Sequence, residues 1–238
     1  MPLNGNQLVA QSCQNASCPG FTAQGQLLLN IVLQELCGTY DFAVARKTLL
    51  FNLPTATDAL GRAPMFFPVD YLRAKPDGNI YFISGVPYDL IPVDLMQLDQ
   101  LVTTPGLANF PTVFATDVSV SPPIAYFWMP PSGAFQAQLR YQAQMPDMTD
   151  FTQIPWFPFQ NYLLTRVTGE LCKITDDDRQ TSLLSYDEEQ HPEGAGSVLR
   201  RILRMKEDEE NRTKRVKLDR QYFGPAFDRL RNTKQVGW

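Results

Sequence analysis

The stretch from Pro155 to about Leu184 constrains the fold of this chain more than any other. Its apolar residues recur at steps of four, four, four and three, a spacing that places them on one face of an α-helix. Polar residues occupy much of the rest, so the helix has one core face and one wet or partner-facing side. Such a helix needs partners, and we expect one near the N-terminus and one after Gly196. The apolar residues are Phe159, Leu163, Val167, Leu171 and Ile174, and the polar ones are Gln160, Arg166, Glu170 and Lys173.

Each of the two expected partner helices has a capping residue. Thr22 is a suitable cap for a helix that runs to about Cys37, where Gly38 ends it. Ser197 is a suitable cap for a helix through about Arg220, and the charged middle of that segment predicts a solvated surface. The sequence therefore predicts three long helices in one core.

Between the first and the central helix, from Thr55 to Asp147, the sequence predicts short β-strands and turns. The chain has 19 prolines, more than the usual share of roughly 5%, and they concentrate in this region. Ile124–Met129, a Pro-Pro-Ser-Gly turn and alternating apolar and polar residues through Gln142 predict a hairpin. Asp77-Gly78 predicts a second hairpin. Further expected elements are strands at Arg46–Leu53, Val69–Arg73, Asn79–Ile83, Tyr88–Ile91 and Thr112–Thr116 and a helix at Val93–Leu101.

These elements predict an α+β fold: a helical bundle of about three long helices with a Pro-rich antiparallel β insertion between the first and second helix. Residues 1–21 are small and polar and predict an extended N-terminal arm. The expected helical core comprises residues 22–53 and 147–221, with the central helix continuing to about Glu189. Residues 54–146 form the β-rich insertion, and residues 222–238 form a C-terminal tail.

Composition argues against several classes of protein. A formal charge of −4 is unlike the basic surface of a general nucleic-acid coat protein. No stretch approaches the roughly 20 apolar residues of a membrane span, and we expect neither a secretory signal nor a membrane partner. His191 is the single histidine, and the four cysteines form no CxxC pair, so no zinc site is expected. Reduced thiols are the favoured interpretation, with a Cys13–Cys18 bridge as the alternative.

We expect neither enzymatic activity nor a cofactor. The sequence contains no phosphate loop, dinucleotide-binding fingerprint or nucleophile elbow. His191 lies in a Gly/Pro-rich break, where an exposed loop histidine is a better interpretation than a catalytic base. The aromatic cluster Trp156–Phe159 is better explained as core packing than as a base-stacking platform, because no basic residue lies beside it before Arg166.

Two acidic clusters and an aromatic tail stand out as candidate functional segments. Hard carboxylates suit Mg²⁺ or Ca²⁺, but adjacent helical positions point about 100° apart and cannot converge on one ion, so we interpret the clusters as exposed acidic faces. They are Asp176, Asp177 and Asp178, and Asp187, Glu188 and Glu189. The tail has no core of its own to enter and is expected to be disordered or to dock on a partner. Its aromatic and basic residues include Tyr222, Phe223, Phe227, Arg229, Arg231 and Trp238.

The order of these segments resembles the head-to-tail adaptor (connector) proteins of tailed bacteriophages, particularly those of short-tailed phages. The resemblance covers roughly Thr22 to Tyr222 and departs from the family in the length of the insertion and in the cysteine-bearing N-terminus. Its motifs are patterns rather than catalytic signatures. They are Ser121-Pro122-Pro123-Ile124-Ala125-Tyr126 with Arg140-Tyr141, Ile154-Pro155-Trp156-Phe157, and Asp176–Arg179.

The resemblance implies a structural virion protein that assembles in the host cytoplasm and lies at the head-tail interface. Such adaptors form a dodecameric ring beneath the portal protein, lengthen the channel for duplex DNA and carry a tail or nozzle protein. The partners expected are thus the portal, the tail or nozzle and further copies of this chain. The tail residues named above would dock on the portal. The two acidic clusters would line the channel or an interface, because an acidic wall lets DNA pass without sticking.

Two other functions remain open from the sequence. The first is another connector component, a stopper or a tail terminator. The second is a nucleic-acid-binding protein that uses the basic residues of the last helix, although acids from Glu207 to Glu210 interrupt them and reduce the net field. Those basic residues are Arg200, Arg201, Arg204, Arg212, Lys214, Arg215 and Lys217.

Overall fold

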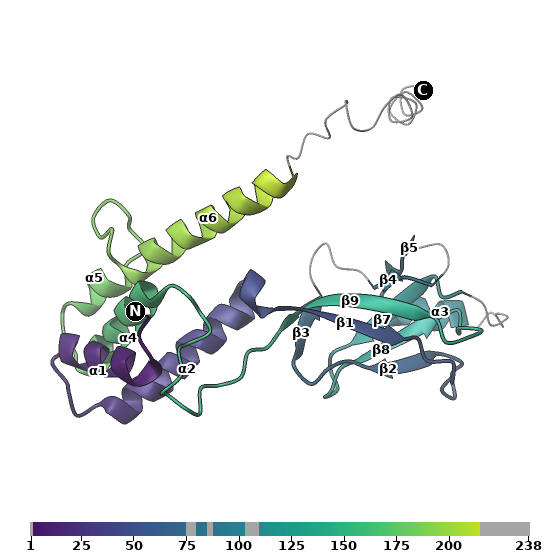
Figure 1. Cartoon of the computed structure of the whole chain (residues 1–238), viewed down its shortest axis with the longest axis horizontal. Helices are drawn as coiled ribbons and strands as arrows, with labels where there is room; N and C mark the ends of the chain where they lie inside the picture. The colour runs from purple at the N-terminus through teal and green to yellow at the C-terminus, as the bar shows by residue number, and fades with distance from the viewer. Residues whose placement is uncertain (1, 75–79, 85–87, 103–109, 215–238) are drawn as a thin grey trace, which may run out of the picture.

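The computed structural model describes residues 2–74, 80–84, 88–102 and 110–214, with the side chains of the last helix described as far as Glu207. The described chain forms a helical lobe and a sheet lobe (Figure 1). It contains six α-helices and two sheets in a mixed α/β arrangement. The predicted fold class, a bundle of about three long helices, is therefore wrong.

The helical lobe is built from both ends of the described chain around one apolar core. Its helices are α1 (Gly5–Asn15), α2 (Thr22–Thr39), α4 (Gln160–Ile174), α5 (Gln180–Leu184) and α6 (Ala195–Lys214). The prediction of α2 is confirmed within two residues at its end. Three of the five predicted inward residues of the central helix are fully buried, whereas Phe159 and Ile174 are exposed. The three buried ones are Leu163, Val167 and Leu171.

The prediction of an extended arm over residues 1–21 is wrong, because α1 is a buried helix. Asn4 caps it: the Asn4 side chain accepts from the Gln7 backbone N–H at 2.8 Å, and the Gln7 side chain accepts from the Asn4 backbone N–H at 3.0 Å. Leu8, Val9 and Cys13 are buried against α2 and α4. This reciprocal capping stabilises a helix whose composition is otherwise polar.

The predicted central helix is shorter than expected. It begins at Gln160 rather than Pro155, because Pro158 disfavours a helical conformation at the residue before it. It ends at Ile174, and Asp176 adopts a left-handed conformation with φ of 54°, which interrupts the helical hydrogen bonds. A separate helix, α5, then ends at Leu184 rather than at about Glu189.

The sheet lobe consists of two sheets that share one core. One sheet has the order β1-β9-β4-β5, with β3 also pairing with β9, and the other has the order β2-β8-β7-β6. Side chains from both sheets, Phe82 and Leu139 from the first and Phe127 from the second, are fully buried in this core. A helix, α3 (Leu95–Val102), contacts β7 and β8. The strands are β1 (Arg46–Asn52), β2 (Ala63–Phe66), β3 (Tyr71–Ala74), β4 (Tyr81–Phe82), β5 (Tyr88–Asp89), β6 (Ile91–Pro92), β7 (Val113–Asp117), β8 (Ile124–Trp128) and β9 (Gln136–Ala143).

The strands at β8 and β9 were predicted correctly, but their pairing was not. They do not form a hairpin: β9 pairs antiparallel with β1 over seven positions, whereas β8 pairs with β7 and β2 in the other sheet. The Pro-rich turn therefore carries the chain from one sheet to the other. The pairing of β6 with β7 is parallel, so the lobe is not wholly antiparallel. The predicted turn at Asp77-Gly78 lies outside the described residues.

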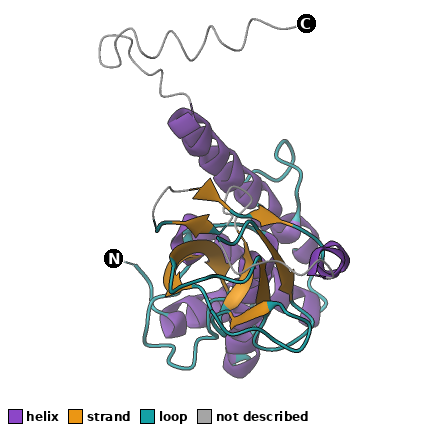
Figure 2. Cartoon of the chain, turned by 90° about the vertical axis from the view of Figure 1, so that its right-hand side faces the viewer, coloured by secondary structure: helices purple, strands orange, loops and turns teal. Residues whose placement is uncertain are grey.

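The two lobes are joined by two chain crossings and by side chains between them. Gln34 of α2 donates to the Met145 carbonyl at 2.7 Å, Cys37 donates to the Ala143 carbonyl at 3.2 Å, and Arg73 donates to the Gly38 carbonyl. Viewed from the sheet-lobe end, the strands lie in front of the helices and α6 rises beyond both (Figure 2).

Candidate assembly surface

The N-terminal half of α6 is anchored in the helical lobe. Leu199 and Ile202 are buried in its core, and Val198 and Leu203 pack against it. The neighbouring helices are α4 and α5. The first turns of α6 therefore form a root in the core, with two buried and two partly buried apolar residues, and the charged middle of the helix lies beyond it.

A close contact between a glycine and a tyrosine ring holds this root against the preceding loop. The ring of Tyr186 lies over Gly196, so that a Cβ at Gly196 would lie 2.5 Å from the ring carbon Cδ1. The guanidinium of Arg200 lies 5.7 Å from the centroid of the same ring, a cation–π distance. Tyr186 nevertheless keeps 46% of its surface exposed. Ring and guanidinium together form an exposed aromatic and basic spot at the start of α6.

The outer half of α6 leaves the lobe. Met205 is 55% exposed, and Lys206 approaches the Phe42 ring with 5.7 Å between Nζ and the ring centroid. Beyond this point the helix runs on to Lys214 and projects away from both lobes (Figure 1). An isolated helix of this length is marginal in water.

An open apolar hollow of about 610 Å³ lies beside the root of α6. Residues of α6 and of the start of α4 line it, and Arg201 lies at it with its guanidinium donating to the Pro192 carbonyl at 2.7 Å. The hollow adds apolar surface next to the basic residues of α6. Its apolar lining includes Phe159, Tyr162, Val198, Ile202 and Met205.

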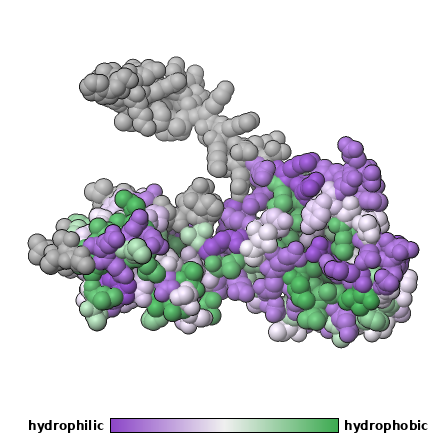
Figure 3. Space-filling view, turned by 180° about the vertical axis from the view of Figure 1, so that it is seen from behind, coloured by the Kyte–Doolittle hydropathy of each residue, from purple (hydrophilic) through white to green (hydrophobic). Residues whose placement is uncertain are grey.

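The helical lobe also exposes hydrophobic side chains away from α6, as Figure 3 shows. Leu27 and Ile31 lie one turn apart on α2 and are 61% and 52% exposed. Ile174 at the end of α4 is 51% exposed. Isolated exposed apolar residues are normal, but the Leu27–Ile31 pair gives α2 an outward apolar ridge.

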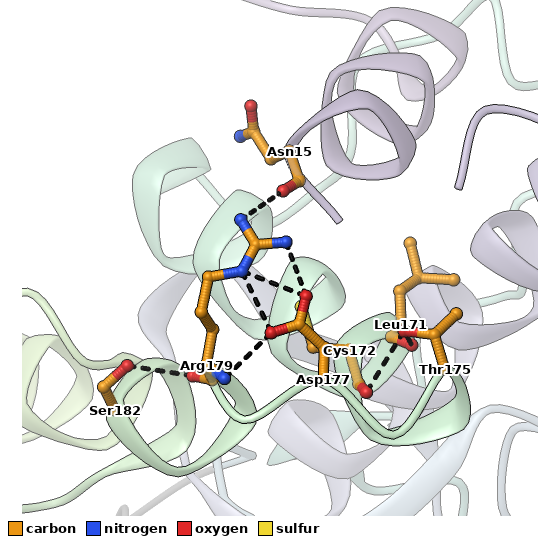
Figure 4. Close-up of polar contacts among 7 residues, drawn as sticks. All are labelled: Asn15, Leu171, Cys172, Thr175, Asp177, Arg179 and Ser182. Carbon is orange, nitrogen blue, oxygen red and sulfur yellow. Dashed lines mark hydrogen bonds and ion pairs between the residues drawn. The ribbon is translucent and has the colours of Figure 1, made fainter. Parts of the chain in front are cut away.

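The first acidic cluster lies in the turn between α4 and α5, not on a helix. Asp177 pairs with Arg179, whose Nη2 lies 2.6 Å from Oδ2 and whose Nη1 donates to the Asn15 carbonyl of α1 at 3.0 Å (Figure 4). The Arg179 side chain and backbone N–H lower the pKa of Asp177 to about 2. Asp177 thus stabilises this turn and its contact with α1. Asp176 and Asp178 are exposed.

The second acidic cluster lies in the loop between α5 and α6. Two of its three residues also make hydrogen bonds or an ion pair within the chain. Asp187 accepts from the backbone N–H groups of Glu189 and Gln190 at 3.0 and 3.2 Å. Glu188 pairs with Arg204 of α6 at 2.9 Å. Glu189 is exposed. Because Asp177, Asp187 and Glu188 have partners within the chain, only half of the six predicted acidic residues are exposed and outside such contacts in the described structure.

The six acidic side chains do not converge on a common cation site in the structure. Within the described ranges, no group of three His, Cys, Asp or Glu side chains is arranged to hold a metal. The four cysteines are free and buried. The six tail residues from Tyr222 to Trp238 lie outside the described residues. The contacts that sequence reasoning missed are those of Tyr186 with Gly196 and Arg200, because they join segments with no shared periodicity.

A partly buried ion-pair cluster joins α4 to α2 below this surface. Arg166 lies 3.2 Å from Glu35 and 3.1 Å from Glu170, and its side chain is 17% exposed. Burial raises the pKa of the neighbouring Tyr162 well above its ordinary value. The cluster therefore positions α4, on which α6 rests.

Comparison with known proteins gives no family for this chain. A scan against protein-family models finds no match, and a search of curated protein sequences finds no relative. Among the helices that the structure describes, none is both long enough and apolar enough to cross a bilayer.

Proposed function

We propose that this chain is a structural virion protein, a head-to-tail adaptor that forms a ring beneath the portal, extends the DNA channel and attaches the tail. The observation that carries the proposal is the projecting half of α6, a charged helix rooted in the helical lobe and aimed away from it. A helix that projects from its lobe is stabilised by docking on a partner, because most helical stability in proteins comes from tertiary packing. It also leads directly to the aromatic and basic tail from Tyr222 to Trp238.

Other parts of the described surface support an assembly role. The Leu27–Ile31 ridge and the hollow beside α6 provide apolar contact area on the helical lobe. Interfaces are anchored by aromatic and arginine side chains, and Tyr186 with Arg200 forms such a pair. The exposed acids Asp176, Asp178 and Glu189 are the remaining candidates for a wall that lets duplex DNA pass.

The test is analytical ultracentrifugation of the purified chain, alone and mixed with the portal protein encoded alongside it. A chain that sediments slowly alone and joins a large complex with the portal supports an adaptor that assembles on its template. A chain that never joins the portal contradicts the proposal. If that chain instead shifts on duplex DNA with steep salt dependence, the nucleic-acid-binding function is favoured.

A truncated variant separates docking from folding. Deletion of Tyr222–Trp238 is expected to leave thermal stability near that of the full chain and to abolish the complex with the portal. Substitution of Asp176, Asp178 and Glu189 by asparagine or glutamine is the matched control, because it alters a different surface and should leave portal binding intact. Unfolding of the truncated chain would show that the tail belongs to the core.

A further inference from the structure

The helical lobe and the sheet lobe have separate cores. No residue belongs to both clusters of buried side chains, and every extensive packing between two described elements lies within one lobe. Each chain crossing is anchored in the helical core by one side chain, Phe42 on the way out and Met148 on the way back. The two crossings meet at the sheet lobe, because Arg46 at the start of β1 pairs with Gln142 of β9. Two short crossings that meet at one strand pair have the geometry of a hinge.

The return crossing is held along α2 by polar side chains on one face of that helix. Asn30 donates to the Met148 carbonyl at 3.2 Å and accepts from the Met148 N–H at 2.9 Å, which fixes the end of the crossing. Gln34 donates to the Met145 carbonyl at 2.7 Å. Cys37 accepts from the Met145 N–H at 3.4 Å. The bonds of this polar latch, Gln34 and Cys37, are of a kind that water replaces when the crossing leaves α2, so each contributes little net stability.

A buried polar side chain at the same joint is left without a partner. Gln142 is 1% exposed, and within the residues that the structure describes neither its Oε1 nor its Nε2 atom has a hydrogen-bond partner. The other outward-facing residues of β9 are wholly or partly exposed, so the sheet itself does not bury Gln142. Arg46 and Arg73 flank it on the neighbouring strands, and they reach across the joint to Asp41 and to the Gly38 carbonyl. An unpartnered buried amide destabilises the closed joint, and opening lets water reach it.

From these contacts we propose that the joint is a hinge. The crossings pivot between their anchors, and the sheet lobe turns as a body relative to the helical lobe while both cores stay intact. Weak polar bonds hold the joint closed, and the unpartnered amide of Gln142 opposes them. The open joint is therefore populated in the free chain, and a partner of the sheet lobe can select it. The hinge does not depend on the function proposed above.

Cys37 reports on the hinge because its buried thiol lies in the polar latch, whereas the buried thiols of Cys13 and Cys172 lie in the helical core. The unaltered full chain is treated with N-ethylmaleimide in a urea series below its unfolding transition, and mass spectrometry of the digested protein gives the labelling rate of each cysteine. We expect Cys37 to react roughly tenfold faster than Cys172, with little dependence on urea, because a hinge exposes little surface. Equal rates with the same steep urea dependence would overturn the proposal, since only global unfolding would then reach Cys37.

Two substitutions should move the labelling rate of Cys37 in opposite directions. Gln34→Ala removes the bond to Met145 and should raise the rate roughly two- to tenfold. Its matched control is Gln24→Ala, at an exposed position of the same helix, which should leave the rate unchanged. Gln142→Met removes the unpartnered amide at similar volume and should lower the rate. A rise with Gln142→Met, or no change with Gln34→Ala, would contradict the hinge.

Pulsed electron paramagnetic resonance separates a turning lobe from local fraying of α2. Spin labels at Leu27→Cys on α2 and Val118→Cys in the sheet lobe measure the distance between the lobes, and brief labelling at these exposed positions spares the buried thiols. We expect a broad or two-component distance distribution that widens with Gln34→Ala. The control pair, Leu27→Cys with Ile174→Cys, lies within the helical lobe and should give one narrow distance. A single narrow distance between the lobes, with and without Gln34→Ala, would show that only the helix end frays and would refute the hinge.

Discussion

Replacing Gly196 by alanine tests how α6 is held to the helical lobe. The backbone at Gly196 is helical, so alanine itself is compatible with the conformation. The new Cβ, however, would lie 2.5 Å from Cδ1 of Tyr186 and 2.7 Å from Cδ2. The ring is attached to backbone that also hydrogen-bonds to α6 through Ser185, so it cannot move away freely. The ring must therefore be displaced, and its contact with Arg200 must be lost.

Two opposing contributions set the change in the free energy of unfolding that Gly196→Ala causes. Overpacking of this kind costs about 1–3 kcal/mol, while alanine is favoured over glycine within a helix by up to ~1 kcal/mol. We expect Gly196→Ala to lower the free energy of unfolding by about 1–2 kcal/mol. In the Tyr186→Ala background the ring is absent, and the same change should stabilise the protein by up to ~1 kcal/mol. The sign of the effect reverses between the two backgrounds.

The assay is denaturant unfolding followed by helical circular dichroism on the four proteins of the double-mutant cycle. For a protein of this size, 1 kcal/mol corresponds to roughly 2–4 °C in Tm, so thermal scans resolve the effect independently. A Gly196→Ala change that stabilises both backgrounds equally would refute the reasoning, since the ring would then not oppose the Cβ.

Three further predictions test other parts of the chain. The lowered pKa of Asp177 means that its stabilising contribution is present above pH 4 and lost as the pH falls through about 2. Between pH 4 and pH 2 the Asp177→Asn variant should therefore lose less Tm than the unaltered protein. Asn4→Ala removes the α1 cap and should cost about 1 kcal/mol by denaturant unfolding; an unchanged midpoint would contradict the capping box. Phe157→Ala removes a fully buried ring and should cost about 3–5 kcal/mol, whereas Phe159→Ala, at an exposed position, should cost far less.

Sequence reasoning located most individual elements because their signals are local. The helix from Thr22, the strand from Arg46 and the alternation through Gln142 lie close to the positions predicted for them. α1 was missed, although Asn4 and Gln7 carry the spacing of a capping box. The polar composition of the first 21 residues obscured that signal.

The candidate site could be predicted only in part. The sequence identified the acids and the charged helix, but it could not show that Asp177 is taken up by Arg179 or Glu188 by Arg204. Ion pairs of this kind depend on how two segments approach each other, and no spacing along the chain encodes the second pair, which is 16 residues apart.

The sequence alone determined which faces of helices and strands are apolar, because side-chain direction follows from local backbone geometry. Tertiary structure decided which faces meet. The strand at Ile124–Trp128 and the strand at Gln136–Ala143 have the sequence pattern of a hairpin. The first nevertheless pairs with β7 and the second with β1. β9 gained seven paired positions with β1 and a shared core with the opposite sheet. Burying the inner faces of both sheets stabilises the fold more than a local hairpin through the short turn would. This preference depends on residues far apart in the sequence, so it is seen only in the assembled lobe.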